Sequence, residues 1–513
     1  MTAQPATTQR GRPTDGSLGS LSFFWLAFGV LFLLMGSYSL ATPPGASPDE
    51  PAHAMRAYAA AHGQLAGPES TAVPGTLDLQ VSRYFATLES HMPCFKRDVT
   101  NTPACVTPIA HPDSMTTGHS STGVSTPVFY VAVGWPTIVL DGAKGLYAMR
   151  LVSAALCAAL LALAFVALRS LPRSRWATFA LAVGVTPMTL FLSGTVNPNG
   201  LEVAAAASVF SLLAATFGSA TTRRVLAWRI AGITVVGVLL VNTRSIALVW
   251  LLLAVIAALL LAKRTVLLDV FRWWVTWAGV AAVAIVTVVV ALFYLRPRPL
   301  TPAYQPIGAG SSWGQGFSNT IDQTFSFMNG WIAQFGWLEI PVPAIAIAIW
   351  ACVGGAILVA GLALGPRPVK LAALTIGLAV LLLPPFSQAA VIGVAGYIWQ
   401  GRYTLAPAVM LLVVAGIGLD RALAASSERR LALLIRTSVV LLAIGHVGAF
   451  LWMLRRYVTG FTATGTWLDM LRHPLWQPPG GWIAIALLLA LAVAAAGWLT
   501  IRAVAPVQRA VRE

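Results

Sequence analysis

The stretch LSFFWLAFGVLFLLMGSYSL, residues 21–40, is followed after a short gap by SPDEPAHAMR, residues 47–56. The first stretch is apolar and long enough to cross a bilayer as a helix. The second begins a new helix, with Ser47 three residues before Glu50 at the spacing of a capping box and Pro48 suited to the first turn. The chain is therefore expected to leave the membrane and to present two adjacent carboxylates at its edge.

If this second stretch continues as a helix, Asp49, His53 and Arg56 fall at positions i, i+4 and i+7 and share one face. An acid, an imidazole and a guanidinium would then point the same way at the edge of the bilayer. Both acids also fit a purely structural role, because carboxylates cap helix N-termini and complement the helix dipole. This pattern alone leaves a functional site and a helix cap equally open.

The composition indicates an integral membrane protein. Of the 513 residues, 57% are hydrophobic and only 10% are charged, and the mean hydropathy is +0.77. Soluble domains carry roughly a quarter charged residues. Long apolar runs recur to the C-terminus, which predicts an all-α protein whose helices span the membrane. The formal charge of +16 does not indicate a nucleic-acid partner, because the basic residues lie in short loops between apolar runs, where they orient the protein.

The apolar segments predict about twelve membrane spans with both termini in the cytoplasm. The stretch 125–140 is too short for a full crossing and is assigned to a juxtamembrane or re-entrant helix at the outer face. With this choice the loops rich in arginine and lysine fall on the cytoplasmic side, as the positive-inside rule requires. The predicted spans are residues 21–41, 147–168, 176–194, 201–218, 226–241, 246–262, 273–294, 342–364, 370–387, 404–420, 433–453 and 481–499.

We expect one multi-pass transmembrane domain over residues 21–502. A disordered cytoplasmic tail at 1–20 precedes it, and a second cytoplasmic tail at 503–513 follows it. The first extracytoplasmic loop, residues 42–146, is the largest loop, and it holds eight of the 17 acidic residues and five of the seven histidines. Loops of this size are where a polytopic protein can carry function outside the membrane.

Two of the four cysteines, Cys94 and Cys105, lie in this outer loop, whereas the other two sit inside apolar helices. Only the loop cysteines would meet an oxidising compartment, so the sequence predicts a disulfide between them. Metal binding by these cysteines with His91 or His111 has no recognised ligand spacing. The sequence therefore leaves a divalent metal open as an option but does not indicate one.

Charged residues recur at the outer ends of later spans. Glu202 follows shortly after Asn197 at the start of a hydrophobic helix, Arg244 lies at the tip of a tight hairpin, and Arg402 precedes a long apolar run. Such groups are costly in a membrane unless they are paired or face a polar cavity. Arginine at a helix end also snorkels to lipid headgroups, and Tyr403 also fits an aromatic belt. Because carboxylates and arginines gather on the outer side beside the large loop, we favour a site there.

Four features together resemble a known group of proteins. They are Pro48-Asp49-Glu50-Pro51-Ala52-His53 with Arg56, a short aromatic helix before the second span, Asn197-Pro198-Asn199-Gly200-Leu201-Glu202, and Gln400-Gly401-Arg402-Tyr403. This combination resembles the GT-C class of membrane glycosyltransferases, and in particular a bacterial family of uncharacterised multi-pass membrane proteins grouped with that class. The resemblance extends from about residue 20 to residue 500.

Two departures from the pattern limit what the resemblance implies. Where such proteins often have His-Pro-Pro-Leu-Tyr-Tyr, this chain reads Ser125-Thr126-Pro127-Val128-Phe129-Tyr130, so no histidine role carries over there. Asn199 stands where an aspartate is often found, which weakens any assignment of a metal ligand. No cofactor is indicated with certainty.

The resemblance implies an inverting glycosyltransferase that takes its sugar from a polyprenyl-phosphate-linked donor, at the outer face of the bacterial cytoplasmic membrane, for assembly of a cell-envelope glycan or glycoconjugate. Asp49 is the expected general base, with Glu50 as its alternative. Arg402 and Arg244 would stabilise the departing lipid phosphate. The other candidate substrate-binding residues are His53, Arg56, Tyr403, Asn197 and Glu202. The expected partners are the lipid donor, an extracytoplasmic glycan or other hydroxyl acceptor, and membrane lipids.

Two other classes of function remain open. A transporter or flippase for a lipid-linked or anionic solute also fits about twelve spans, although two matching halves and mid-membrane polar groups are missing from the sequence. A non-catalytic scaffold for envelope assembly is the third. The glycosyltransferase hypothesis requires that the start of the first outer loop folds back over the helices and brings Asp49 to Arg402.

Overall fold

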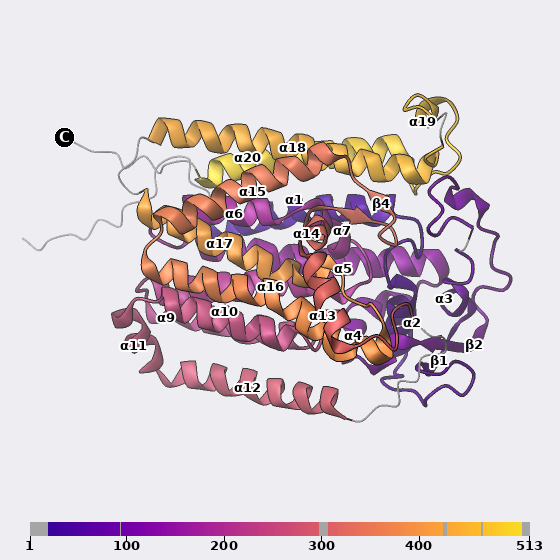
Figure 1. Cartoon of the computed structure of the whole chain (residues 1–513), viewed down its shortest axis with the longest axis horizontal. Helices are drawn as coiled ribbons and strands as arrows, with labels where there is room; N and C mark the ends of the chain where they lie inside the picture. The colour runs from indigo at the N-terminus through magenta and orange to yellow at the C-terminus, as the bar shows by residue number, and fades with distance from the viewer. Residues whose placement is uncertain (1–18, 93, 297–305, 424–427, 463–464, 505–513) are drawn as a thin grey trace, which may run out of the picture.

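The computed structural model describes residues 19–92, 94–296, 306–423, 428–462 and 465–504. Within these ranges the protein is a bundle of long apolar helices that run side by side along the longest axis of the molecule (Figure 1). Ten of the helices are long and apolar enough to cross a membrane. They are α1 (Ser20–Ala41), α5 (Gly142–Arg169), α8 (Pro198–Gly218), α9 (Arg223–Val241), α12 (Trp274–Leu295), α15 (Ala344–Leu364), α16 (Arg367–Ala395), α17 (Leu405–Ala422), α18 (Glu428–Val458) and α20 (Trp482–Val504).

The remaining two predicted spans are also helical but differ from the ten. Residues 176–194 form α6 (Arg175–Gly184) and α7 (Pro187–Ser193), which meet at an angle of 64°. Pro187 explains the break, because proline cannot donate the backbone hydrogen bond that a continuous helix needs. Residues 246–262 form α10 (Ala247–Leu261), whose 15 residues are about 22 Å long, shorter than the ~30 Å hydrocarbon core. The bent pair brings the number of candidate spans among the described residues to eleven.

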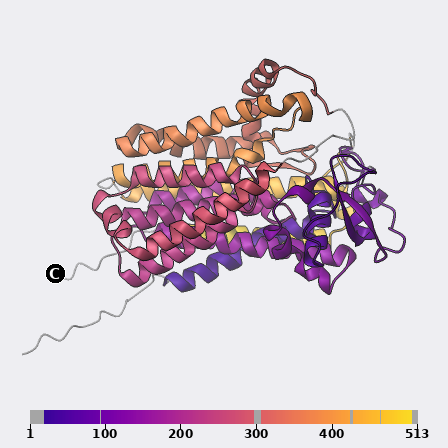
Figure 2. The same ribbon diagram turned by 90° about the horizontal axis from the view of Figure 1, so that it is seen from below.

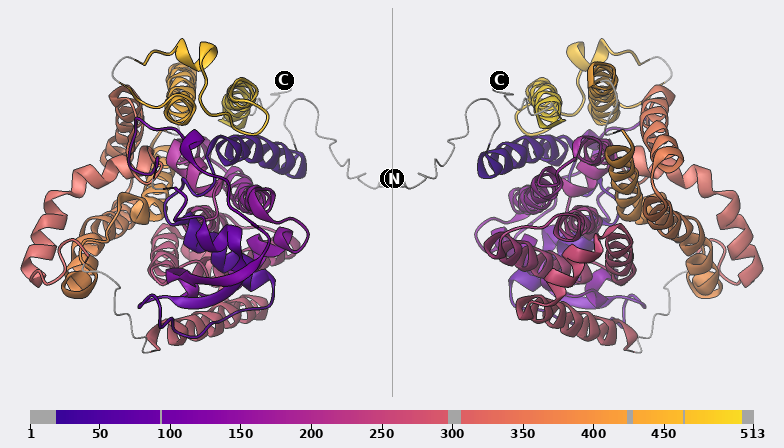
Figure 3. Two further views of the ribbon diagram at one scale, coloured as in Figure 1. Left: turned by 90° about the vertical axis from the view of Figure 1, so that its right-hand side faces the viewer. Right: turned by 90° about the vertical axis from the view of Figure 1, so that its left-hand side faces the viewer.

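The helices differ strongly in burial. The apolar core of α8 is fully enclosed by the other helices, whereas only 6% of the corresponding stretch of α12 is buried. The sequence of α8 is rich in alanine and serine, and small side chains let neighbouring helices approach closely within a membrane. Figure 3 shows α12 at the edge of the bundle. The central helix α8 therefore gives a fixed position to the residues at its N-terminus.

The large loop between α1 and α5 covers one end of the bundle (Figures 1 and 2). Strand β1 (Leu77–Ser82) pairs with β2 (Met115–Ser120) in antiparallel register, with Leu77 opposite Ser120. The helical elements of the loop are α2 (Glu50–Ala61), α3 (Arg83–Thr87), η1 (Pro103–Cys105), η2 (Ser121–Val124), α4 (Val128–Gly134) and η3 (Trp135–Ile138). The predicted short helix at 125–140 is thus present as α4 and η3, and it is too short to span. The N-terminal end of α1 and the C-terminal end of α20 lie at the opposite end of the bundle (Figure 2).

The same end of the bundle carries shorter elements from the second half of the chain. Between α12 and α15 lie α13 (Trp313–Asp322), α14 (Thr324–Ile332), β3 (Gln334–Phe335) and β4 (Ile340–Pro341). The single turn η4 (Gly401–Thr404) precedes α17, and α19 (Asp469–Arg472) follows α18. At the far end, α11 (Arg264–Phe271) connects α10 to α12. A Cβ atom at Gly401 would lie 1.9 Å from the carbonyl oxygen of Phe327, so η4 packs directly on the backbone of α14.

The predicted capping box at Ser47 is not formed. Helix α2 begins at Glu50, and its N-cap is Asp49, which has a left-handed backbone (φ 62°) and makes no capping hydrogen bond with its side chain. The Ser47 hydroxyl is buried without a hydrogen-bond partner among the described residues. The reason lies in tertiary contacts, because the carboxylates of both Asp49 and Glu50 are drawn to arginines elsewhere in the chain.

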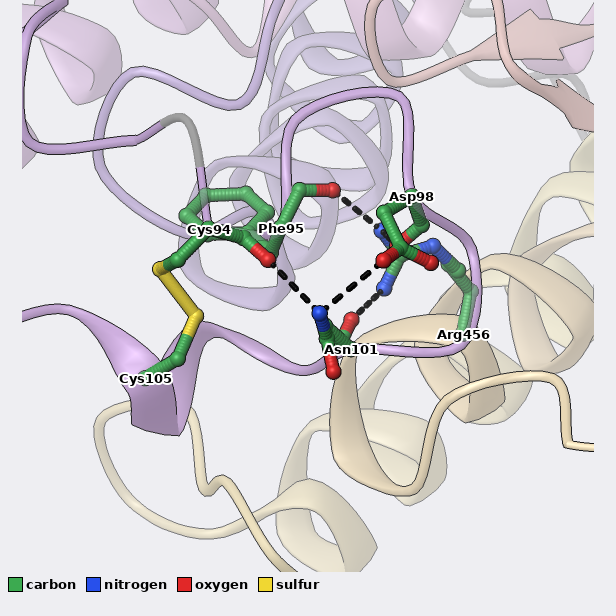
Figure 4. The surroundings of a disulfide bond; sticks show 6 residues. All are labelled: Cys94, Phe95, Asp98, Asn101, Cys105 and Arg456. Carbon is green, nitrogen blue, oxygen red and sulfur yellow. Dashed lines mark hydrogen bonds between the residues drawn. A yellow bond between two sulfur atoms is a disulfide. The ribbon is translucent and has the colours of Figure 1, made fainter.

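The predicted disulfide is confirmed. Cys94 and Cys105 are bonded, with their Cα atoms 6.1 Å apart. The guanidinium of Arg456, at the end of α18, donates hydrogen bonds to the backbone oxygens of Phe95, Asp98 and Asn101 within the loop that the disulfide closes (Figure 4). Arg456 is fully buried. The disulfide loop is thus fastened to the bundle by one arginine.

The predicted tails, 1–20 and 503–513, lie almost entirely outside the described residues. Only Gly19 and Ser20 at the start, and Ala503 and Val504 at the end, are described. Ser20 is the first residue of α1 and Val504 is the last residue of α20.

Candidate functional site

The start of the outer loop folds back over the bundle and brings Asp49 to Arg402, as expected. An Nη2 atom of Arg402 donates to Oδ2 of Asp49 at 2.5 Å, across 353 residues of sequence. Asp49 caps α2, and Arg402 lies in η4 directly before α17. The side chain of Arg402 is 1% exposed, whereas that of Asp49 is 44% exposed. A buried guanidinium therefore holds a carboxylate that solvent or a ligand can reach.

The electrostatics of Asp49 favour its charged form. Burial pushes the pKa of its carboxyl upward, but the charge and hydrogen bond of Arg402, helped by His53 and Arg244, outweigh burial and bring the pKa below its ordinary value. Oδ1 of Asp49 accepts no hydrogen bond from the residues that the structure describes. Oδ2 of Asp49 is therefore occupied by Arg402, and Oδ1 can accept a hydrogen bond from another donor.

His53 lies one helical turn after Asp49 and is almost completely buried. Its Nδ1 atom is 2.9 Å from the hydroxyl of Tyr130 in α4, and the two rings stack. Burial lowers the pKa of His53 to about 4; the charge of Asp49 opposes this effect, and the charges of Arg402 and Arg244 add to it. His53 is therefore neutral near pH 7 and acts as a hydrogen-bonding group rather than a cation.

Arg402 and Arg244 flank the ring of Tyr403. Their Cζ atoms lie 5.3 and 4.2 Å from the ring centroid. Nε of Arg402 donates to Gln400 at 2.7 Å. The Nη1 atoms of both arginines are buried, and neither has a hydrogen-bond partner among the described residues. A buried donor without a partner costs about 1–3 kcal/mol, so these two nitrogens are the strongest indication that the site binds an anion.

Glu202 and Asn197 support the site from the N-terminus of α8. One oxygen of Glu202 accepts from Nε1 of Trp250 at 3.0 Å, and the other lies 4.0 Å from Nη1 of Arg244. Asn197 caps α8 with its side-chain oxygen and donates from Nδ2 to the carbonyl oxygen of Pro48 at 2.9 Å. Asn197 thus fixes the backbone of Pro48, the residue before Asp49. Glu202 forms a long ion pair with Arg244 but no hydrogen bond to it.

Glu50 has a different environment from its neighbour. Its side chain and that of Arg150 are both 0% exposed, and they form two hydrogen bonds, of 2.8 and 2.5 Å. Glu50 also accepts from the backbone N–H groups of Gly45 and Val196. Arg150 donates to three carbonyl oxygens at the end of α1, those of Ser39, Thr42 and Pro43. This pair is saturated and ties α1, α2 and α5 together.

Arg56 does not join the site, although it shares a helix face with Asp49 in the sequence pattern. Its guanidinium donates to the carbonyl oxygens of Gln64 and Leu65, in the turn that follows α2. It also lies 5.9 Å from the ring of Tyr130. Arg56 therefore fixes the C-terminal end of α2.

Among the described residues, no group of three or more histidine, cysteine, aspartate or glutamate side chains is arranged to hold a metal ion. The site instead combines one carboxylate, two guanidiniums and a neutral imidazole. Such a set can accept a proton from a hydroxyl and bind a phosphate, since an arginine fork matches phosphate oxygens.

Sequence reasoning missed three residues that organise the site. Arg150 lies within an apolar helix of 28 residues, and a charge at such a position is itself a signal of a buried partner. Tyr130 and Trp250 supply the hydrogen-bond partners of His53 and Glu202. An aromatic residue in an apolar segment looks the same whether or not its polar atom is used, so only the fold identifies these two.

The chain belongs to the family of predicted membrane proteins designated DUF2142, whose pattern matches residues 31–412. All the site residues described above lie within that region, from Asp49 in the first loop to Tyr403 in η4. No curated protein matches the chain. The family description states membrane location and no activity.

Proposed function

We propose that this protein is an inverting glycosyltransferase of the GT-C type, which uses a polyprenyl-phosphate-linked sugar at the outer face of the cytoplasmic membrane. The hydroxyl oxygen of the acceptor attacks the anomeric carbon of the sugar, and its proton passes to Asp49. The bond between the anomeric carbon and the phosphate oxygen breaks, and the polyprenyl phosphate leaves with the electron pair. A single displacement of this kind inverts the anomeric centre.

The observation that carries this proposal is the asymmetric pairing of Asp49 with Arg402. Nη2 of Arg402 holds the carboxylate while its Nη1 atom remains without a partner among the described residues. One guanidinium can therefore contact the base and the leaving phosphate together. Arg244 offers a second such nitrogen beside the same tyrosine ring. Donors already in place for the developing phosphate charge need no reorganisation during the reaction.

Asp49, rather than Glu50, is proposed as the base. A general base needs hydrogen-bond reach to the hydroxyl that it deprotonates. The side chain of Asp49 is 44% exposed, whereas that of Glu50 is enclosed and holds Arg150 and two backbone N–H groups. His53 is neutral and buried beside Asp49, and we assign it to orienting the acceptor through Tyr130.

The proposed orientation rests on the charges at the two ends of the bundle. The large loop with α2 lies at one end (Figure 1), and Arg402 of η4 contacts Asp49 there. Basic residues lie at the other end of the bundle, where α5 and α17 end and where α9, α11 and α16 begin. Cytoplasmic loops are enriched in arginine and lysine, which supports an extracytoplasmic site. The basic residues at those helix ends are Arg169, Arg421, Arg223, Arg264 and Arg367.

The test is a transfer assay with the purified full chain in liposomes. A panel of polyprenyl-phosphate sugars labelled in the sugar is supplied with envelope membranes as the source of acceptor. We expect label to appear in a glycan with inverted anomeric configuration and free polyprenyl phosphate to be released in equal amount. Asp113→Asn, in the same outer loop and exposed, is the matched control for changes at Asp49.

A transporter gives a different result in the same liposomes. It would move the labelled lipid between leaflets while the sugar–phosphate bond stays intact. Movement of the lipid without bond cleavage, for every donor in the panel, would refute the transferase proposal. A scaffold would produce neither movement nor cleavage.

A further inference from the structure

A half-open cavity with a basic rim lies at the opposite end of the bundle from Asp49. It has a volume of about 550 Å³, within the range of roughly 300–1,000 Å³ that is typical of small-molecule sites. Its walls come from the ends of α8, α10 and α17 and from the connections that follow α5 and α10. The proposed catalytic reaction uses none of these residues.

Three exposed cationic side chains line this cavity: Arg173 in the connection after α5, Lys263 in the connection after α10, and Arg421 near the end of α17. None of them forms an ion pair with a residue in the described part of the chain. Arg421 donates from Nη2 to the carbonyl oxygen of Leu261 at 2.8 Å, which holds its guanidinium against the wall. The cations thus converge on one space from elements that are distant in sequence.

The single carboxylate in the cavity does not neutralise them. Both oxygens of Asp420 accept hydrogen bonds from backbone N–H groups at the start of α6, those of Trp176 and Ala177, at 2.8 and 2.9 Å. Asp420 therefore acts as the cap of α6. With three cations and one committed carboxylate, the cavity keeps a net positive charge.

The remaining wall is apolar and includes Leu171, Ala214, Leu261 and Ile417. A basic rim above an apolar wall at the end of membrane helices matches a ligand that combines a phosphate with a hydrocarbon part. Basic pockets between helices on the cytoplasmic side are known to hold anionic headgroups. Arginines that only orient the protein can lie singly along the surface, whereas these cations share one half-open cavity and lack ion-pair partners among the described residues.

We propose that this cavity binds a phosphate-bearing anion, with the headgroup of an anionic phospholipid as the source that its apolar wall favours. The cations would bind the phosphate oxygens, and the wall would contact the first carbons of the acyl chains. This inference does not depend on the proposed glycosyltransferase activity. It concerns the other face of the membrane and a different set of residues.

The experiment titrates lipid into the purified full chain in neutral detergent and counts bound molecules by native mass spectrometry. The probes are phosphatidylglycerol, phosphatidylcholine and inorganic phosphate. The test variant is Arg173→Gln/Lys263→Gln, because neither side chain donates a hydrogen bond to a described residue and the fold should be preserved. The control is Arg224→Gln/Arg367→Gln, which removes the same charge from exposed positions outside the cavity.

We expect the wild type to bind phosphatidylglycerol more tightly than phosphatidylcholine. Each removed cation should weaken that binding about fivefold, so the test variant should bind about 25-fold more weakly while the control stays close to the wild type. Competition by inorganic phosphate at equal concentration would identify a soluble phosphate as the ligand of the same site, and its absence would identify the lipid. Equal binding of the two lipids, or equal losses in test and control variants, would overturn the proposal.

Discussion

Two adjacent acids, Asp49 and Glu50, each pair with an arginine, but the two pairs differ in burial and in how many of their polar atoms are hydrogen-bonded. Glu50 and Arg150 are both inaccessible, and their polar atoms are occupied by each other and by backbone groups. Asp49 and Arg402 meet through one hydrogen bond, and each keeps an atom without a partner among the described residues. A saturated pair can only stabilise the fold. A pair with spare donor and acceptor atoms can also bind and react.

This difference follows from the backbone at Asp49. Its left-handed conformation ends the preceding loop and starts α2 at the same point. Consecutive side chains therefore leave the chain in different directions, one toward α5 and the other toward η4. Non-glycine residues rarely adopt positive φ, and aspartate tolerates it better than most. The strained position is thus what allows two neighbouring acids to serve two separate purposes.

The largest expected effect is at the open pair. Asp49→Asn removes the proposed base and keeps the shape of the side chain, so turnover should fall by about 10²–10⁴-fold. The midpoint of thermal unfolding in detergent should stay close to that of the wild type, because the carboxylate is half exposed and the asparagine oxygen can still accept from Arg402. Undiminished transfer by this variant would show that the two pairs do not differ in the way proposed.

The saturated pair should give the converse result. Glu50→Gln leaves the charge of Arg150 buried without a counterion, which typically costs about 3–5 kcal/mol. Chemical denaturation in detergent would measure the loss. Glu89→Gln is the matched control, since the side chain of Glu89 in its pair with Lys96 is 58% exposed and ion pairs at the surface contribute about 0–1 kcal/mol. Equal stability of the two variants would contradict the structural role of Glu50.

The pH dependence of stability tests the environment of His53, which lies beside the open pair. Burial lowers the pKa of this histidine from 6.5 to about 4. Below pH 6.5 this histidine is protonated in the unfolded chain, but in the folded chain it stays neutral until the pH is near 4. The free energy of unfolding therefore falls as the pH falls from 6.5 to 4. The shift corresponds to about 3 kcal/mol. Between pH 7 and pH 4 the free energy of unfolding should fall by about 3 kcal/mol less in His53→Gln than in the wild type.

The smallest effect concerns a third arginine, Arg456, whose two terminal nitrogens bind carbonyl oxygens of the disulfide loop. Cys94→Ser/Cys105→Ser opens the loop whose carbonyl groups bind this guanidinium. Closing a loop of this length stabilises a protein by about 2–3 kcal/mol, and the unfolding free energy should fall by that amount. Turnover should be unchanged when assayed below the unfolding midpoint. A loss of turnover without a loss of stability would place the disulfide loop in the site.

The local features of this protein were predictable because they depend on short stretches of chain. A run of about 20 apolar residues must form a helix in a bilayer, since its backbone groups have no other partners. Length also separated the short aromatic helix at 128–138 from the spans. Two cysteines in the large outer loop predicted the disulfide. Each of these conclusions used residues within a single segment.

The partners of charged groups were harder to assign from the same sequence. The helix face shared by Asp49, His53 and Arg56 predicted one cluster, yet Arg56 turns to its own helix end. The capping box at Ser47 was wrong for the same reason, because Glu50 pairs with Arg150 instead. Periodicity determines which side chains share a face, but it does not say what lies opposite that face.

The sequence by itself determined the membrane class, the positions of the helices, the large outer loop and the acid at its start. Only the tertiary structure decided that Asp49 meets Arg402 across 353 residues, that Glu50 is enclosed with Arg150, and that Arg173, Lys263 and Arg421 share one cavity. Helix formation in a membrane follows from the local requirement to satisfy the backbone. The choice of ionic partner follows from which helix ends the packed bundle places side by side, and that information is distributed over the whole chain.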